Sequence, residues 1–123
     1  MKVLLSIKPG YADKIFLGEK KYEFRRTVFK NQKVIHVVVY ASSPVRQVIG
    51  EFEIVEIIHD DVNALWKRTH CSAGISEEKF LEYFSDKDMG YAIQIGKLQR
   101  YQHPLSLERE FGLTPPQSFV YLS

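Results

Sequence analysis

The chain has 123 residues, 45% of them apolar and 26% charged, which is typical of one soluble globular domain with a single hydrophobic core. Its formal net charge of +2 gives no general electrostatic attraction to nucleic acid, so any such binding must depend on a local basic patch. The single cysteine, Cys71, excludes an internal disulfide and a zinc site with two thiolates.

The N-terminal part is predicted to form a strand, a short helix and a second strand. Residues 3–7 are apolar and β-prone, and a Pro-Gly pair ends them. Residues 11–17 have helical spacing, and Gly18 stands where a helix often ends on a left-handed residue. Residues 21–28 alternate, which predicts a strand with Glu23 and Arg25 on one face.

The middle of the chain is predicted to contribute two strands. Residues 33–41 are almost continuously apolar, which predicts a strand covered on both faces. Residues 47–59 form a long strand whose alternation breaks, because Val55 and Ile57 fall on the face of the acidic residues. We therefore expect a bulge or a bend there, and Gly50 is a candidate for the bend.

The C-terminal half is predicted to contain two helices and two strands. Residues 61–71 form a helix, and a second helix follows Ser76, with Phe80, Leu81 and Phe84 buried. Residues 91–98 form a strand, residues 104–113 are irregular, and residues 118–122 form a short last strand. This order predicts one α+β domain over residues 1–123, with a mainly antiparallel, curved sheet of five or six strands. Closing that sheet into a barrel would remove its exposed edges.

Charged residues cluster where the first helix passes into the second strand. An arginine offers a planar fork to a base edge or a phosphate, a lysine offers a point charge, and an ionised glutamate accepts a hydrogen bond from a base amino group. The alternative is a solvated strand face with cross-strand ion pairs. The cluster comprises Lys20, Lys21, Glu23, Arg25 and Arg26.

Aromatic and hydroxyl residues form a second candidate set. Aromatic rings interleaved with basic residues suit single-stranded RNA, whose bases stack while its phosphates pair with cations. The alternative is ordinary packing in the core and at its rim. The set comprises Tyr11, Tyr40, Ser42, Ser43, Ser118 and Tyr121. The four histidines show no spacing typical of a metal site, and we expect neither a metal nor another cofactor.

The residues Gly18, Lys20, Glu23 and Arg25 have the spacing G-x-K-x-x-E-x-R, directly after the segment SIKPGYADKI. With the later segments YASSP, GEFE and PPQSF, this pattern resembles the ASCH domain over residues 6–121. The resemblance implies a PUA-like β-barrel with a short N-terminal helix, a two-helix insertion and a cleft beside the first helix.

The resemblance also implies a ligand and residues that would contact it. Members of the family are thought to bind RNA or modified nucleosides, and some are linked to transcription coactivation. Lys20, Glu23 and Arg25 correspond to the charged cleft residues. Weaker candidates are Lys8 and Tyr11 at the cleft mouth and Ser42 and Ser118 on its opposite wall. A domain that binds a protein partner remains an alternative.

Two hydrolytic activities occur among relatives of this family. Hydrolysis of N4-acetylcytidine uses a lysine, a threonine and a glutamate. This chain has Lys20, but Glu23 stands in the threonine's place and the position of the family's glutamate falls at about Ala73, which is not an acid, so the set is incomplete. The other activity is metal-independent cleavage of RNA, in which Lys20 with Tyr11 or Ser118 would deprotonate a 2′-hydroxyl and stabilise the transition state.

We therefore expect a domain that binds RNA or a modified nucleoside, with a ribonuclease as the alternative. No apolar stretch approaches the roughly 20 residues that a membrane-spanning helix needs, and we expect a cytoplasmic protein without membrane contact.

Overall fold

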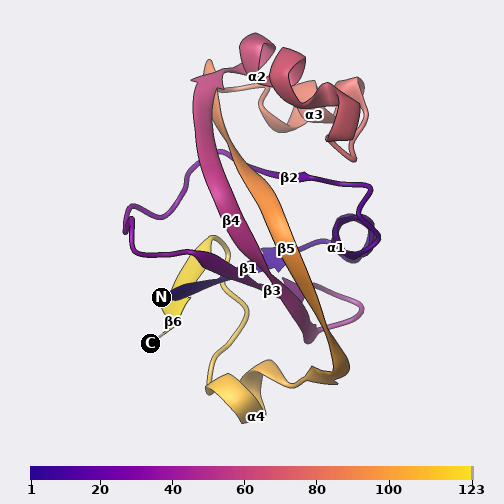
Figure 1. Ribbon diagram of the computed structural model, residues 1–123, viewed down its shortest axis with the longest axis vertical. Coiled ribbons are helices and arrows are strands. Elements are labelled where there is room, and N and C mark those ends of the chain that lie inside the picture. Colours follow the sequence, from indigo (N-terminus) through magenta and orange to yellow (C-terminus); the bar gives the residue numbers. More distant parts are fainter. Residues whose placement is uncertain (123) are drawn as a thin grey trace.

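The structure is a computed structural model that describes residues 1–122. Its elements follow the predicted order, with one added helix between the last two strands (Figure 1). They are β1 (Lys2–Ile7), α1 (Pro9–Phe16), β2 (Tyr22–Arg25), β3 (His36–Ala41), β4 (Gln47–Asp61), α2 (Val62–Thr69), the 3₁₀ turn η1 (His70–Ser72), α3 (Glu77–Tyr83), β5 (Met89–Leu105), α4 (Leu107–Phe111) and β6 (Phe119–Leu122).

The strands form one six-stranded sheet in the order β2-β5-β4-β3-β1-β6. All neighbouring strands are antiparallel except β1 and β3, which run parallel because α1 and β2 return the chain to the same end. The two long strands β4 and β5 run side by side through most of the molecule's height (Figure 1). In this open sheet β2 and β6 are the edge strands, and the closed barrel stays a prediction.

The predicted irregularity of β4 is confirmed. Its register with β5 shifts between Val48 and Gly50, between Phe52 and Ile54, and between Ile54 and Glu56. Each shift resets which face the following residues occupy, so apolar side chains can reach the same face on both sides of a break.

Helices α2 and α3 pack over one end of β4 and β5. Phe80 and Phe84 of this unit are buried as predicted, and they pack against Phe24 of β2. The prediction that Leu81 is buried is wrong, because this residue is 42% exposed. The reason is helical geometry: a neighbouring residue lies about 100° around the axis from Phe80, so Leu81 faces outward.

Helix α4 lies where the sequence predicted irregular structure. The Ser106 side chain accepts a hydrogen bond from the Arg109 N–H at its start, and Gly112 ends it in a left-handed conformation. Leu107 is buried among residues of β1, β3 and β4, a cluster that also contains Tyr40. This packing stabilises a helix that is too short to be stable on its own.

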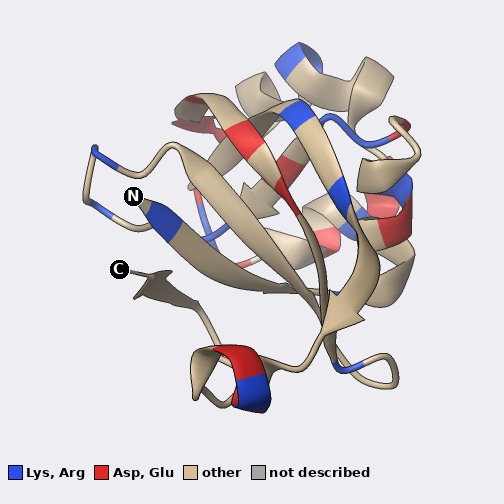
Figure 2. Ribbon diagram, turned by 60° about the horizontal axis from the view of Figure 1, so that its bottom comes forward, with Lys and Arg blue, Asp and Glu red and all other residues tan. Residues whose placement is uncertain are grey.

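Lys and Arg residues are interspersed with Asp and Glu residues over strands and helices alike (Figure 2). Some of them pair at the surface, such as Arg68 with Asp60 at 3.5 Å. This mixture agrees with the small net charge, so attraction of a charged ligand must come from a local concentration of one sign.

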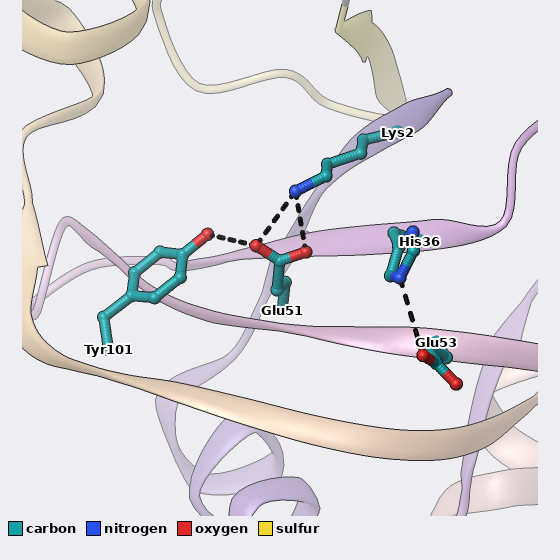
Figure 3. A network of polar contacts seen from close by, with 5 residues as sticks. All are labelled: Lys2, His36, Glu51, Glu53 and Tyr101. Carbon is teal, nitrogen blue, oxygen red and sulfur yellow. Dashed lines mark hydrogen bonds and ion pairs between the residues drawn. The ribbon is translucent and has the colours of Figure 1, made fainter.

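Polar side chains from four neighbouring strands, β1, β3, β4 and β5, interact across the sheet (Figure 3). The buried Glu51 carboxylate accepts hydrogen bonds from Lys2 Nζ at 2.9 and 3.1 Å and from the Tyr101 hydroxyl at 3.0 Å. Burial alone would raise the pKa of Glu51, but the hydrogen bonds from Lys2 and Tyr101 hold it below its usual value. Next to it, His36 lies 3.8 Å from Glu53. Because every partner of Glu51 is within the fold, the network serves to tie β1, β4 and β5 together.

No helix among residues 1–122 has the length and apolar character required to cross a membrane.

Candidate functional site

A cavity of about 490 Å³ lies between the end of β1, the start of α1, β2 and α3. Its volume is within the range of sites that hold small organic ligands. We call it the Lys20 cavity. It is lined by Ser6, Ile7, Lys8, Tyr11, Lys20, Glu23, Phe24, Arg25, Arg26, Ile75, Lys79, Glu82 and Tyr83.

Lys20 is a buried cation at this cavity, with only 3% of its surface exposed. Its Nζ donates a hydrogen bond of 2.8 Å to the Ala73 carbonyl, and it lies 4.7 Å from the ring centre of Phe24 and 5.3 Å from that of Tyr11. Burial lowers the pKa of Lys20 to about 8, although the charge of Glu23 opposes this shift; the nearby Lys14 adds to it. The amine is therefore partly neutral near physiological pH, which suits proton transfer as well as binding.

The connector between η1 and α3 fixes the position of Lys20. Three consecutive carbonyls, from the last residue of η1 into this connector, accept hydrogen bonds: Ser72 from the Lys21 N–H, Ala73 from Lys20 Nζ and Gly74 from Lys14 Nζ. Gly74 has a φ of +67°, and a Cβ built on it would lie 2.5 Å from the Lys20 Cβ. Only a glycine allows the connector to approach Lys20 so closely in this conformation.

Glu23 and Arg25 lie on the same face of β2, as the alternation predicts, and they pair at 3.1 Å. The same guanidinium donates to the Ser118 carbonyl at 2.9 Å and to the Ser6 carbonyl at 3.4 Å. Arg25 thus connects β2 with β1 and with the segment before β6. This pairing orients a carboxylate and a cation at the cavity. Each group still has hydrogen-bonding positions that the pairing does not use.

Helix α3 supplies a wall that the sequence interpretation missed. Lys79, Glu82 and Tyr83 line the cavity, and their i, i+3, i+4 spacing could have shown that they share one helix face. The Arg26 guanidinium lies 4.1 Å over the Tyr83 ring, and its Nε donates to the Tyr83 carbonyl at 2.8 Å. Burial raises the pKa of Tyr83, so its hydroxyl stays protonated and able to donate.

Most of the predicted site residues lie together at the cavity. Lys8, Tyr11, Lys20, Glu23 and Arg25 all line the Lys20 cavity. Arg26 lines it as well, whereas Lys21 is exposed and is not among the lining residues.

The predicted hydroxyl and aromatic set is dispersed. Neither Ser42 nor Ser118 is among the lining residues; the Ser42 N–H donates to the Ile7 carbonyl, and Ser118 contributes only its carbonyl to Arg25. Tyr40 is buried in the cluster with α4, and the Tyr121 hydroxyl accepts hydrogen bonds from the backbone of residues 30 and 31. Ser43 is exposed in the turn between β3 and β4.

The cavity concentrates positive charge. Its lining has five basic and two acidic residues, a surplus of three, whereas the entire chain has a surplus of two. A concave surface with such a surplus attracts anions more strongly than a flat surface does. Within residues 1–122, no three His, Cys, Asp or Glu side chains are grouped so as to hold a metal ion.

The burial of Lys20 predicts a pH dependence of stability. Its pKa is about 8 in the fold against an ordinary value of 10.5, so the unfolded chain binds more protons between these values. The free energy of unfolding should therefore rise with pH, by about 2 kcal/mol from roughly pH 7 to pH 9.5. Urea unfolding of wild type and Lys20→Met over this range measures the effect. The variant should lack this rise, and parallel profiles for the two proteins would contradict the prediction.

Comparisons with known proteins find matches that cover most of the chain. Residues 2–114 match the family model described as Domain of unknown function (DUF365). A Zymomonas mobilis protein named ASCH domain-containing ribonuclease is 30% identical over 125 residues, which cover 98% of this chain and 84% of that protein. The crystal structure of ASCH from the same organism has a TM-score of 0.90 at 30% identity, over 99% of this chain and 87% of that chain.

Two other relatives are matched over part of their length only. In Ureaplasma parvum, a protein named ATP synthase subunit alpha is 32% identical to 98% of this chain, and one named large ribosomal subunit protein uL22 is 30% identical to 98% of it. This chain spans 15% of the first protein and 39% of the second.

Proposed function

This chain belongs to the ASCH domain family and to the family described as Domain of unknown function (DUF365), and from this premise we propose that it binds RNA or a modified nucleoside in the Lys20 cavity. One observation carries the proposal: a buried lysine and a paired glutamate and arginine meet at one cavity. The relative named as a ribonuclease supports RNA as the kind of ligand.

The residues at the cavity suit the recognition of a base. The Glu23 carboxylate accepts a hydrogen bond from a base amino group, and Lys20 and Arg25 donate to base carbonyl oxygens. The half-buried ring of Tyr11 offers an aromatic face on which a base stacks. We also propose that the domain is a PUA-like barrel and that the protein is cytoplasmic, as the sequence predicts.

A second candidate function is metal-independent cleavage of RNA. It is favoured by the pKa of about 8 at Lys20, which leaves part of the amine neutral and able to accept a proton from a 2′-hydroxyl. Tyr11 adjoins this amine, so it suits the role of second catalytic group better than Ser118, which is not among the cavity-lining residues. Hydrolysis of N4-acetylcytidine is less well supported, because Lys20 faces the Ala73 backbone carbonyl where an acid would be needed.

Binding assays with one variant and a matched control test the proposal. We expect short single-stranded RNA or a modified nucleoside to bind wild type at low salt, with fluorescence anisotropy as the readout for RNA and a thermal shift for nucleosides. Lys20→Met should weaken binding by about tenfold or more, since it removes a charged hydrogen-bond donor. Lys21→Met, which removes the same charge one residue away outside the cavity, should have little effect.

The outcomes separate the two candidate functions. Cleavage of RNA in the presence of EDTA by wild type, but not by Lys20→Met, would establish the ribonuclease. Binding without cleavage would favour the binding domain. Absence of binding to every RNA and nucleoside tested, or equal weakening by Lys20→Met and Lys21→Met, would refute the proposed site.

A further inference from the structure

We infer that the Lys20 cavity takes a phosphorylated nucleotide unit, with the base inside and the phosphate held at the outer rim by Lys8, Arg26 and Lys79. The ligand is then a nucleotide or a nucleotide within RNA, and a free nucleoside would occupy only part of the site. This inference rests on the proposed function and narrows it.

The cavity has an inner and an outer part that differ in exposure. Lys20 and Glu23 are buried, at 3% and 7% exposure, and form the inner part together with the buried Phe24. Lys8, Arg26, Lys79 and Glu82 are exposed and form the outer rim. The inner part is thus suited to a flat, partly apolar group, and the rim is suited to a group that keeps contact with water.

The inner charges already have partners within the fold. Lys20 donates to the Ala73 carbonyl, and Arg25 pairs with Glu23 at 3.1 Å. A neutral base, with its own donors and acceptors, adds hydrogen bonds here without upsetting this balance. A phosphate in the same place would meet the Glu23 carboxylate, so the inner part, whose charged residues Lys20, Glu23 and Arg25 leave a surplus of only one positive charge, attracts it less than the rim does.

The rim cations lack such compensation. Among residues 1–122, no acidic side chain lies within 4.0 Å of Lys8, Arg26 or Lys79. Glu82 is the one acidic residue of the rim, so the rim keeps a surplus of two positive charges. That surplus matches the charge of a terminal phosphate monoester, about −1.5 to −2 near neutral pH. It exceeds the single negative charge of a phosphodiester within RNA.

Arg26 is held ready for such a contact. Its guanidinium stacks 4.1 Å over the Tyr83 ring, and its Nε is fixed by the Tyr83 carbonyl at 2.8 Å. In the described part of the chain its two terminal nitrogens donate no hydrogen bond, so they are available as a planar fork for phosphate oxygens. An arginine whose orientation is set in advance loses less entropy on binding than a freely moving one.

Calorimetric titration at about 50 mM salt tests the inference with the four common ribonucleosides, their 5′- and 3′-monophosphates, inorganic phosphate and a polyglutamate peptide. We expect at least one monophosphate to bind about tenfold tighter than its nucleoside. Lys8→Gln/Lys79→Gln should remove most of this advantage, so that the monophosphate binds the variant about as weakly as the nucleoside does. Lys33→Gln/Lys97→Gln, which removes the same charge at exposed positions away from the cavity lining, should keep the advantage.

Each outcome decides between the alternatives. Equal affinity for nucleosides and monophosphates would overturn the rim assignment while the proposed function stands. The same conclusion would follow if longer RNA bound but none of the monophosphates did. Loss of the advantage in both double variants would show general electrostatic attraction and would also overturn it. Binding of polyglutamate without nucleotides would assign the rim to an acidic protein. Failure of every nucleoside, nucleotide and RNA to bind would refute the proposed function itself.

Discussion

Replacement of Arg25 by methionine is expected to lower the free energy of unfolding by about 2 to 3 kcal/mol, somewhat less than the roughly 3 to 5 kcal/mol lost when one partner of a fully buried ion pair is removed, because Arg25 is only partly buried. The Glu23 carboxylate would lose the cation that lies 3.1 Å from it and would stay buried. The carbonyls of Ser6 and Ser118 would lose a donor as well, and β2 would lose a connection to β1 and to the segment before β6. Urea unfolding followed by circular dichroism measures the loss.

A matched control and a double variant isolate the cause. Arg26→Met makes the same substitution at the next residue, which is exposed and has no acidic partner within 4.0 Å among residues 1–122, so it should cost much less. Adding Glu23→Gln to Arg25→Met should recover part of the stability, because the carboxylate that lacked a partner is gone. Equal losses for Arg25→Met and Arg26→Met would mean that the ion pair contributes little.

Local patterns in the sequence were sufficient to predict most elements of this fold. The strand β2 follows from alternating residues, the end of α1 from Gly18, which has a φ of 80°, and the start of α3 from Ser76, whose side chain caps the helix. Each of these signals acts within a few residues, where backbone conformation and hydrogen bonding decide the outcome. Alternation also placed Glu23 and Arg25 on one face of β2, and the family resemblance added Lys20 to them as a third cleft residue.

Contacts between distant segments could not be predicted in this way. Nothing near Lys20 indicates that its Nζ would meet a carbonyl 53 residues later, or that Lys79 and Tyr83 of α3 would close the same cavity. Likewise α4 depends on burial of Leu107 among three strands rather than on its own propensity. Such features depend on tertiary packing, which a single sequence leaves open.

Gly74→Ala is expected to be the most damaging small substitution in the connector, with a loss of about 2 to 5 kcal/mol of unfolding free energy. Part of this cost arises because alanine disfavours the left-handed conformation at φ +67°. The larger part is steric: the new Cβ would lie 2.5 Å from the Cβ and 2.6 Å from the Cγ of Lys20. Either Lys20 or the connector must move, so the hydrogen bond from Lys20 Nζ to the Ala73 carbonyl is strained or lost.

Gly112→Ala provides the matched control. Gly112 has nearly the same φ, +65°, but a Cβ there would meet no atom within 4 Å, so this variant reports the backbone cost alone, about 1 to 2 kcal/mol. The excess loss in Gly74→Ala then measures the contact with Lys20. We expect ligand binding to fall in Gly74→Ala and to be unchanged in Gly112→Ala, because only the first displaces the lysine. Equal stability and equal binding in the two variants would show that the connector does not position Lys20.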